Sequence, residues 1–194
     1  MSQDQDQNYI KSIIMGDTHT LALLVEKYKH MVFTLAFRMV KNREEAEEVL
    51  QDVFIKVYNA VDSYNGDAKF STWLYKIAYN KSLDYLKKQK RSLDTFSVDD
   101  YENMDFAEME NITRNIEEKE RKEAIGKILK ELSAKDSVLI TLYYYEELSL
   151  IEIAKVMDLS PNTVKVQLHR SRKRLAKLLK EKLEPEIIQG YGKK

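Results

Sequence analysis

The densest group of basic side chains in this 194-residue sequence lies between Pro161 and Lys182. Eight lysines and arginines stand there against one acid, Glu181, whereas a solvated helix usually alternates the signs of its charges. At about 100° per residue one face of the segment is apolar. The other face carries Asn162, Lys165, Val166, His169, Arg170 and Lys173. Because an α-helix fits the major groove, this pattern predicts a helix that meets DNA through its polar face.

The residues just before this basic segment predict the motif that would position it. Ser149 and Glu152 have the spacing of a capping box, which begins a short helix. Asp158 suits a left-handed turn residue, and Ser160 with Pro161 can begin the next helix. The buried side chains of the first helix would be Ile153, Ala154 and Met157. Together these signals predict a helix-turn-helix whose second helix is the recognition helix.

An acidic helix is predicted from about Glu44 to Val61. Its acids are Glu44, Glu45, Glu47, Glu48 and Asp52, with Gln51 among them. Acids in a first turn also stabilise the helix dipole, which is an alternative explanation for Glu44 and Glu45. Glu48 and Asp52, however, place like charges one turn apart at some cost in stability. We interpret the acidic face as a docking surface for a basic protein.

A basic helix is predicted from Ser71 to Arg91. Its cations are Lys76, Lys81, Lys87, Lys88, Lys90 and Arg91, and its aromatic residues are Trp73, Tyr75 and Tyr79. Cations bind phosphates and rings stack on unpaired bases, so the pattern suits nucleic acid. The alternative is that Trp73 and Tyr79 are core residues and the lysines only keep the surface soluble. The preceding loop, with Tyr64, Asn65 and Lys69, has the composition to hold an extruded base.

The helical patterns predict an all-α protein of two small domains joined by a flexible acidic linker. We assign residues 1–16 to an N-terminal extension, 17–91 to a helical domain and 92–116 to the linker, which has seven acids and one arginine. Residues 117–184 form a second, four-helix domain that ends in the helix-turn-helix, and 185–194 form a tail.

Composition excludes several classes of protein. The sequence has no cysteine, and its three histidines lack the spacing of metal ligands. Phosphate-binding loops, dinucleotide turns and nucleophile elbows are absent from it. Neither a signal peptide nor an apolar run of membrane-spanning length is present. We therefore expect a cytoplasmic protein that is not an enzyme, inserts into no membrane and binds no metal or cofactor.

The acidic helix, the loop and basic helix, the acidic linker and the helix-turn-helix follow one another in a recognisable order. Over roughly Asp17–Glu184 the chain resembles a bacterial RNA polymerase sigma factor of the sigma-70 family, in the extracytoplasmic-function (ECF) group. The resemblance implies a transcription initiation factor that binds core RNA polymerase and directs it to promoters through their minus-10 and minus-35 elements. It implies contacts with the beta-prime coiled coil and the beta flap, and an anti-sigma factor as a further partner.

The resemblance also implies roles by position. Polymerase binding falls to Glu45, Glu47, Glu48, Gln51, Asp52 and Phe54. Minus-10 recognition falls to Tyr64, Asn65, Lys69, Phe70, Ser71, Thr72, Trp73, Lys76, Asn80 and Lys81. Minus-35 recognition falls to Asn162, Thr163, Lys165, Val166, His169, Arg170, Arg172 and Lys173.

Two features depart from the family pattern. Asp158 stands where the family often has glycine, and Val166 and His169 are weaker readers of guanine than arginine is. Two other functions remain alternatives. One is a stand-alone helix-turn-helix regulator, and the other is a sigma mimic that sequesters an anti-sigma factor.

Overall fold

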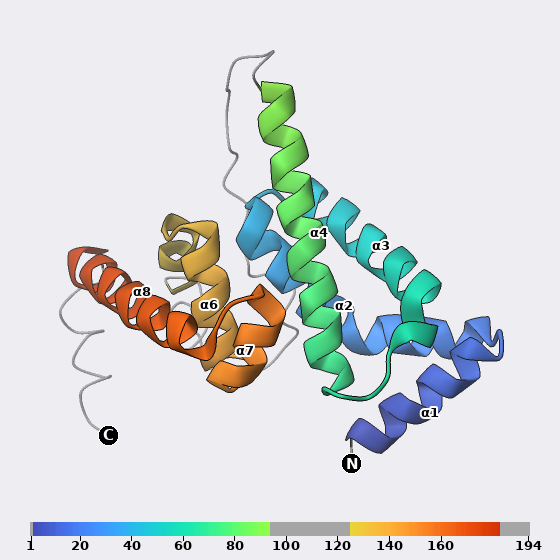
Figure 1. The fold of residues 1–194 in the computed structure, drawn as a ribbon. Coiled ribbons are helices and arrows are strands. Elements are labelled where there is room, and N and C mark those ends of the chain that lie inside the picture. The colour runs from blue at the N-terminus through green and yellow to red at the C-terminus, as the bar shows by residue number, and fades with distance from the viewer. Residues whose placement is uncertain (1, 94–124, 183–194) are drawn as a thin grey trace, which may run out of the picture.

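The computed structural model describes residues 2–93 and 125–182, and within these ranges every regular element is a helix (Figure 1). The all-α prediction is therefore confirmed for the part of the chain that is described. The first half contains α1 (Ser2–Ile14), α2 (Thr18–Val40), α3 (Arg43–Ala60), the 3-10 turn η1 (Val61–Ser63) and α4 (Phe70–Leu93). The second half contains a helix at residues 125–131, then α6 (Ala134–Tyr144), α7 (Leu150–Met157) and α8 (Pro161–Lys182). No helix in these ranges is both long and apolar enough to cross a bilayer.

Capping residues end α2 and begin α3 within a two-residue connection, so that the two helices pack against each other. The carboxylate of Asp17 accepts the amide of His19 at 2.9 Å, which satisfies a free donor at the start of α2. Lys41 ends α2 in the left-handed conformation, with φ of 62°. Asn42 then caps α3 by accepting the amide of Glu45 at 3.1 Å. The two-residue connection holds the acidic helix against α2.

The core of the first half forms where α2, α3 and α4 pack together. Leu24, Val53 and Leu74 are fully buried there. Phe70, at the start of α4, lies 5.5 Å from the ring of Tyr28 on α2 and 5.5 Å from the ring of Tyr64, between ring centroids. These contacts fix the loop before α4 to the core.

The N-terminal extension is a helix that the sequence analysis did not predict. On its inner face Asp6 is 5% exposed and accepts hydrogen bonds from the Tyr28 hydroxyl at 2.6 Å and from Lys27 Nζ at 2.5 Å. Ile10 and Ile13 of α1 are buried as well. Burial and the neighbouring Asp6 raise the pKa of Tyr28 above its ordinary value. A buried hydroxyl–carboxylate contact thus anchors α1 to α2.

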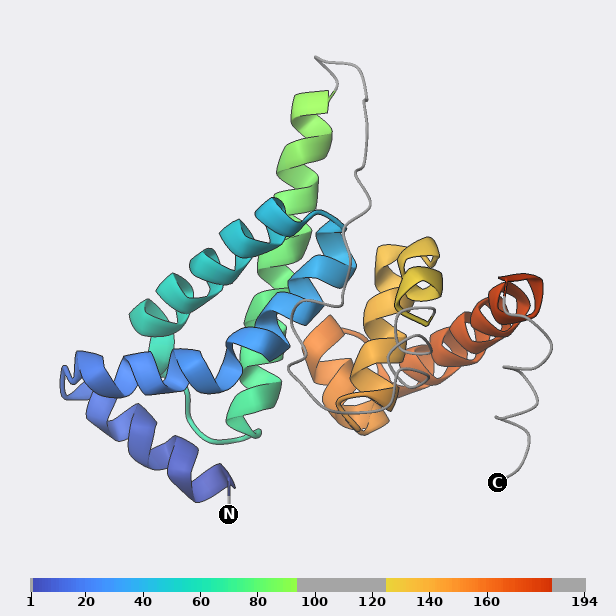
Figure 2. The same ribbon diagram turned by 180° about the vertical axis from the view of Figure 1, so that it is seen from behind.

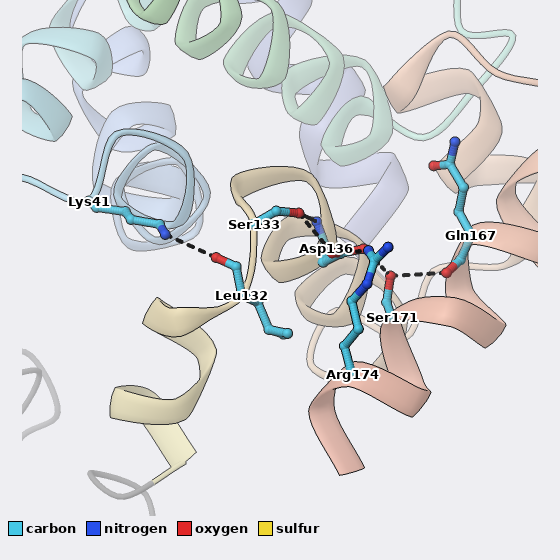
Figure 3. Close-up of polar contacts among 7 residues, drawn as sticks. All are labelled: Lys41, Leu132, Ser133, Asp136, Gln167, Ser171 and Arg174. Carbon is cyan, nitrogen blue, oxygen red and sulfur yellow. Dashed lines mark hydrogen bonds and ion pairs between the residues drawn. The ribbon is translucent and has the colours of Figure 1, made fainter. Parts of the chain in front are cut away.

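The two halves touch along α2 and α4. Helix α4 packs against α7 and α2 packs against α6, so the buried apolar side chains form one continuous cluster (Figures 1 and 2). Lys41 Nζ donates to the carbonyl of Leu132 at 2.9 Å across this boundary (Figure 3). Nearly all of the predicted acidic linker, and the tail at 185–194, lie outside the described residues.

Candidate nucleic-acid interface

The helix-turn-helix forms as its sequence signals predict. Ser149 and Glu152 make a complete capping box at the start of α7. Asp158 ends α7 in the left-handed conformation, with φ of 56°, so an aspartate serves at this turn where the family often has glycine. The hydroxyl of Ser160 then accepts the amide of Thr163 at 3.1 Å, and Pro161 is the first residue of α8. The turn and both caps thus fix the direction in which the recognition helix leaves α7.

A buried carboxylate holds the recognition helix against α6. Asp136 is 7% exposed, and its Oδ1 lies 2.5 Å from Ser171 Oγ on α8 (Figure 3). Its Oδ2 accepts Arg174 Nη1 at 2.5 Å and Ser133 Oγ at 2.8 Å. Burial alone would raise the pKa of Asp136, but the hydrogen bonds from Ser171, Ser133 and Arg174 outweigh it and lower the pKa. The sequence analysis did not identify this role of Asp136.

The opposite face of α8 is open to solvent. Its exposed side chains line one shallow depression: Asn162, Lys165, Val166, His169 and Arg170. Val166 is 51% exposed, although it is apolar, so it is available for contact with a thymine methyl group or another apolar surface. The structure therefore brings together most of the residues that the sequence analysis assigned to minus-35 recognition.

Three residues assigned to minus-35 recognition do not line this depression. Thr163 Oγ1 lies 2.8 Å from Ser160 Oγ, so its hydroxyl belongs to the helix cap. The guanidinium of Arg172 lies over the rings of Tyr143 and Tyr144, 5.0 and 5.3 Å from their centroids. Lys173 is exposed but lies outside the depression.

The acidic helix α3 presents most of its predicted docking residues. The exposed ones are Glu47, Glu48, Gln51 and Asp52. Glu45 is half-buried and accepts Gln89 Nε2 of α4 at 2.6 Å, and burial raises its pKa. Phe54 is only 9% exposed and packs in the core, so the predicted docking residues differ in their access to a partner.

Two features of α3 were not found from the sequence. Lys81 of α4 lies 3.7 Å from Asp52, so the acidic face has a basic neighbour that is distant in sequence. Ile55 and Tyr58 are 60% and 50% exposed, one and two turns beyond Gln51. The sequence did contain a signal for this surface, because both apolar residues stand at helical spacing from Gln51 and so share its face of the helix.

The loop before α4 is held in a defined shape. The Tyr64 hydroxyl donates to the carbonyl of Ala68 at 2.6 Å, and the side chain of Asn65 bonds that of Asp67. Gly66 sits between them with φ of 81°, a conformation that favours glycine. Asn65 and Lys69 are exposed on this loop, and Lys69 Nζ lies 3.2 Å from Glu152 Oε1 of α7.

The predicted minus-10 residues of α4 differ in their exposure to solvent. Lys76 and Asn80 are exposed, and Ser71, Trp73 and Lys81 are partly exposed. Phe70 and Thr72 are buried, at 1% and 2% exposed. Of the aromatic residues of this helix, Tyr75 and Tyr79 are core residues, which for Tyr79 is what the alternative interpretation held. Trp73 is partly exposed and lies beside Tyr64, 5.6 Å away between ring centroids.

The chemistry of these surfaces is that of binding. Within the described ranges, no three side chains of the metal-ligating kinds gather at one place. The three surfaces carry opposite charges: α3 is acidic, whereas α8 and the exposed side of α4 are mainly basic. One surface therefore suits a basic protein and the other two suit phosphates.

Comparison with known families identifies two regions of the chain. Residues 24–92 match the model of sigma-70 region 2, and residues 122–175 match that of sigma-70 region 4. Two curated ECF relatives are each 34% identical. The sigma factor SigW of Bacillus subtilis aligns over 89% of this chain and 95% of its own length. The sigma-E factor of Escherichia coli K12 aligns over 86% and 90%.

Solved structures share the fold. The sigma factor RpoE of Bartonella quintana, determined with the anti-sigma factor NepR, has a TM-score of 0.66 and 21% identity. It covers 82% of this chain and 96% of its own. CnrH, determined with the cytosolic domain of CnrY, has a TM-score of 0.64 and 22% identity, over 92% and 99%.

An exposed acidic helix, a basic helix before the middle of the chain and a basic helix-turn-helix are the features expected of a promoter-directing initiation factor. The chain belongs to the sigma-70 family of RNA polymerase sigma factors, in its ECF group. As such it binds core RNA polymerase and promoter DNA, which confirms the function predicted from the sequence.

Proposed function

We propose that the exposed face of α8 recognises the minus-35 element. The observation that carries this assignment is the single depression lined by Lys165, Val166, His169 and Arg170 on a helix that Asp136 fixes from behind. A rigid helix with cationic side chains on its free face can enter a major groove without reorganisation. Lys165 and Lys173 would supply phosphate affinity, and Arg170 would meet base edges.

The exposed acids of α3 would bind the beta-prime coiled coil of polymerase. Glu48 and Gln51 are exposed to a basic partner, with Glu48 hydrogen-bonded to the Tyr85 hydroxyl of α4, whereas Asp52 would exchange Lys81 for it. Ile55 and Tyr58 extend the same helix with apolar surface, which can be desolvated on binding. Phe54 would contribute by holding α3 on the core.

The loop at Tyr64–Lys69 and the exposed part of α4 would bind the melted minus-10 strand. Trp73 and Tyr64 offer ring edges, while Lys69, Lys76 and Asn80 offer polar contacts. Capture of an unpaired base would offset the few kcal/mol that unstacking costs, a magnitude known from base-flipping enzymes. Promoter opening by this chain would then need no catalytic group, and we propose that it is not an enzyme.

Other parts of the proposal rest on the family. Because its partner is RNA polymerase, the protein would act in the cytoplasm, and the domain that carries α8 would dock on the beta flap. An anti-sigma protein is a further proposed partner, since the Bartonella quintana sigma factor of the same fold was determined with one.

Reconstitution with core polymerase tests these assignments. The purified chain should support specific initiation on genomic templates, and Glu48→Lys should lose core binding while its circular dichroism spectrum is unchanged. Glu26→Lys is a matched control, since it reverses an exposed acid on α2, outside the proposed surface. If Glu48→Lys binds core polymerase as tightly as Glu26→Lys does, the docking assignment is wrong.

The same assay separates the alternatives. A stand-alone regulator would bind duplex promoter tightly without polymerase, and a sigma mimic would give no initiation on any template. Arg170→Ala should weaken initiation selectively at promoters that depend on the minus-35 element. An equal loss at all promoters would reduce Arg170 to a phosphate contact.

A further inference from the structure

A chain of aromatic rings connects α2 to the loop that is proposed to capture a minus-10 base. The rings of Tyr64, Phe70 and Trp73 form a triangle, with centroids 5.5 to 5.6 Å apart in all three pairs. Tyr28 of α2 is the fourth member, since its ring centroid lies 5.5 Å from that of Phe70. Phe70 and Tyr28 are buried, at 1% and 8% exposed, whereas the other two rings are partly exposed. Because buried side chains are closely packed, a shift of Tyr28 would move Phe70 and with it the exposed pair.

The buried end of this chain is the Tyr28 hydroxyl, which α1 holds. The hydroxyl donates to Asp6 Oδ2 at 2.6 Å, and Asp6 is 5% exposed. Asp6 Oδ1 accepts Lys27 Nζ at 2.5 Å, and this ammonium also lies over the Tyr28 ring, 5.2 Å from its centroid. The carboxylate therefore fixes the hydroxyl of Tyr28, and the ammonium that it holds fixes the face of the same ring.

A second contact joins α1 to the same loop. Helix α1 packs against η1, the turn that ends directly before Tyr64 (Figures 1 and 2). Burial, and after it the charge of Asp6, raises the pKa of Tyr64, so this carboxylate lies near the loop as well as near α2. The Tyr64 hydroxyl in turn donates to the carbonyl of Ala68 at 2.6 Å and holds the loop closed. Asp6 is therefore linked to the loop from two sides.

Support of this kind matters because the loop has to receive a base that leaves its stack. Capture repays the cost of unstacking only in part if the rings must first be ordered, so a loop that is already held in shape gains more from the same contacts. Helix α1 lies before residues 24–92, which match sigma-70 region 2. The proposed minus-10 loop is thus supported by a helix outside the matched region.

We propose that Asp6 is a positioning residue for minus-10 capture, which acts through Tyr28 and Phe70 to hold Tyr64 and Trp73 in the arrangement that receives the unpaired base. The effect on capture rests on the minus-10 assignment made above, whereas the effect of Asp6 on Trp73 does not. If Asp6 only added stability to α1 and α2, its removal would leave the surroundings of Trp73 in the folded protein unchanged.

The fluorescence of Trp73 reports on this cluster in the full chain, because the sequence has no other tryptophan. Asp6→Ala should shift the emission to longer wavelength and increase quenching by acrylamide, since loosened rings admit water to the indole. Tyr28→Phe keeps the ring but removes the hydroxyl, and it should change the emission in the same direction. Asp6→Asn retains an oxygen that can accept from Tyr28 and should keep the emission close to that of the unaltered chain.

Asp17→Ala is the matched control. It also removes one acid from the α1–α2 pair, together with the cap at the start of α2, so it should lower stability as well. The partners of Asp17 are His19 and Thr20, which are not part of the aromatic chain. Each variant is measured at a temperature at which it is folded. If Asp17→Ala changes the emission as much as Asp6→Ala does, or if Tyr28→Phe leaves it unchanged, the proposal is overturned.

Initiation on two templates tests the consequence for promoter opening. With Asp6→Ala, initiation by the holoenzyme on a duplex promoter should fall about 3- to 30-fold, because misplaced rings lose part of the gain from capture. The loss should be smaller on a template whose minus-10 region is already unpaired, since unstacking then costs less. Equal losses on both templates would overturn the role in capture.

Trp73→Ala tests the minus-10 assignment separately. Normal initiation by that variant on duplex DNA would refute the assignment, and with it the role of Asp6 in capture. The fluorescence of the Asp6 and Tyr28 variants would still decide whether Asp6 positions the rings.

Discussion

Replacing Asp136 with alanine removes the side chain that holds the recognition helix on α6. The variant loses the contacts of both carboxylate oxygens: Ser171 on one side, and Arg174 with Ser133 on the other (Figure 3). The substitution leaves the free face of α8 unaltered. Any loss of minus-35 recognition would therefore come through the position of the helix.

The size of the effect follows from the exposure of each partner. A hydrogen bond to a charged group contributes about 1.5–3 kcal/mol, and the buried Ser171 contact belongs in that range. The Arg174 side chain is 60% exposed, so its ion pair contributes only about 0–1 kcal/mol. In the variant the Ser171 hydroxyl can still donate to the carbonyl of Gln167, 3.0 Å away, so it retains a hydrogen-bond partner. We expect Asp136→Ala to lower the free energy of unfolding by about 2–4 kcal/mol.

Urea unfolding of the full chain, followed by circular dichroism, measures this loss. A double-mutant cycle with Ser171→Ala should give a coupling energy above about 1 kcal/mol, and one with Arg174→Gln a smaller value. In transcription assays, Asp136→Asn should weaken initiation at promoters that need the minus-35 element. The affinity of this variant for core polymerase should stay normal, because the side chains bonded to Asp136 are Ser133, Ser171 and Arg174, and none of them belongs to α3.

Two results would refute this reasoning. Coupling between Asp136 and Ser171 within about 0.5 kcal/mol of zero would show that the carboxylate does not hold the helix. Equal loss of initiation at all promoters, with normal core binding, would show that Asp136 has no selective effect on minus-35 recognition.

Four further expectations follow from the same structure. Stability should fall in acid, because the pKa of Asp136 is lower in the folded chain than its unfolded-state pKa of about 3.9. The ionised carboxylate stabilises the fold above that unfolded-state pKa, and this contribution is lost as the pH falls through the folded-state pKa. Asp136→Asn should therefore flatten the pH profile of urea midpoints below about pH 4. Asp6→Ala, which leaves the buried Tyr28 hydroxyl without its acceptor, should cost about 1–3 kcal/mol in urea unfolding, and an unchanged midpoint would mean that α1 is not anchored there. Lys165→Ala should reduce the salt dependence of holoenzyme binding to promoter DNA by about one unit of slope; an unchanged slope would remove Lys165 from the phosphate contacts. Tyr58→Ala should weaken core polymerase binding in a pull-down titration while leaving circular dichroism unchanged, and undiminished binding would restrict the docking surface to the acids of α3.

Local signals predicted the second half of the protein well. The capping box at Ser149, the left-handed Asp158 and the Ser160–Pro161 start are all set by interactions within a few residues, so the chain itself encodes them. The division of α8 into a buried face with Val164 and an exposed face with Lys165 likewise follows from helical periodicity alone.

Contacts between distant segments could not be predicted in this way. Asp136 precedes Ser171 by 35 residues, and nothing in either segment indicates that their side chains meet. The same holds for Lys81 beside Asp52, which changes the interpretation of the acidic face. Phe54, Phe70 and Thr72 were assigned to surfaces by position in a motif, but burial is decided by how α3 and α4 pack.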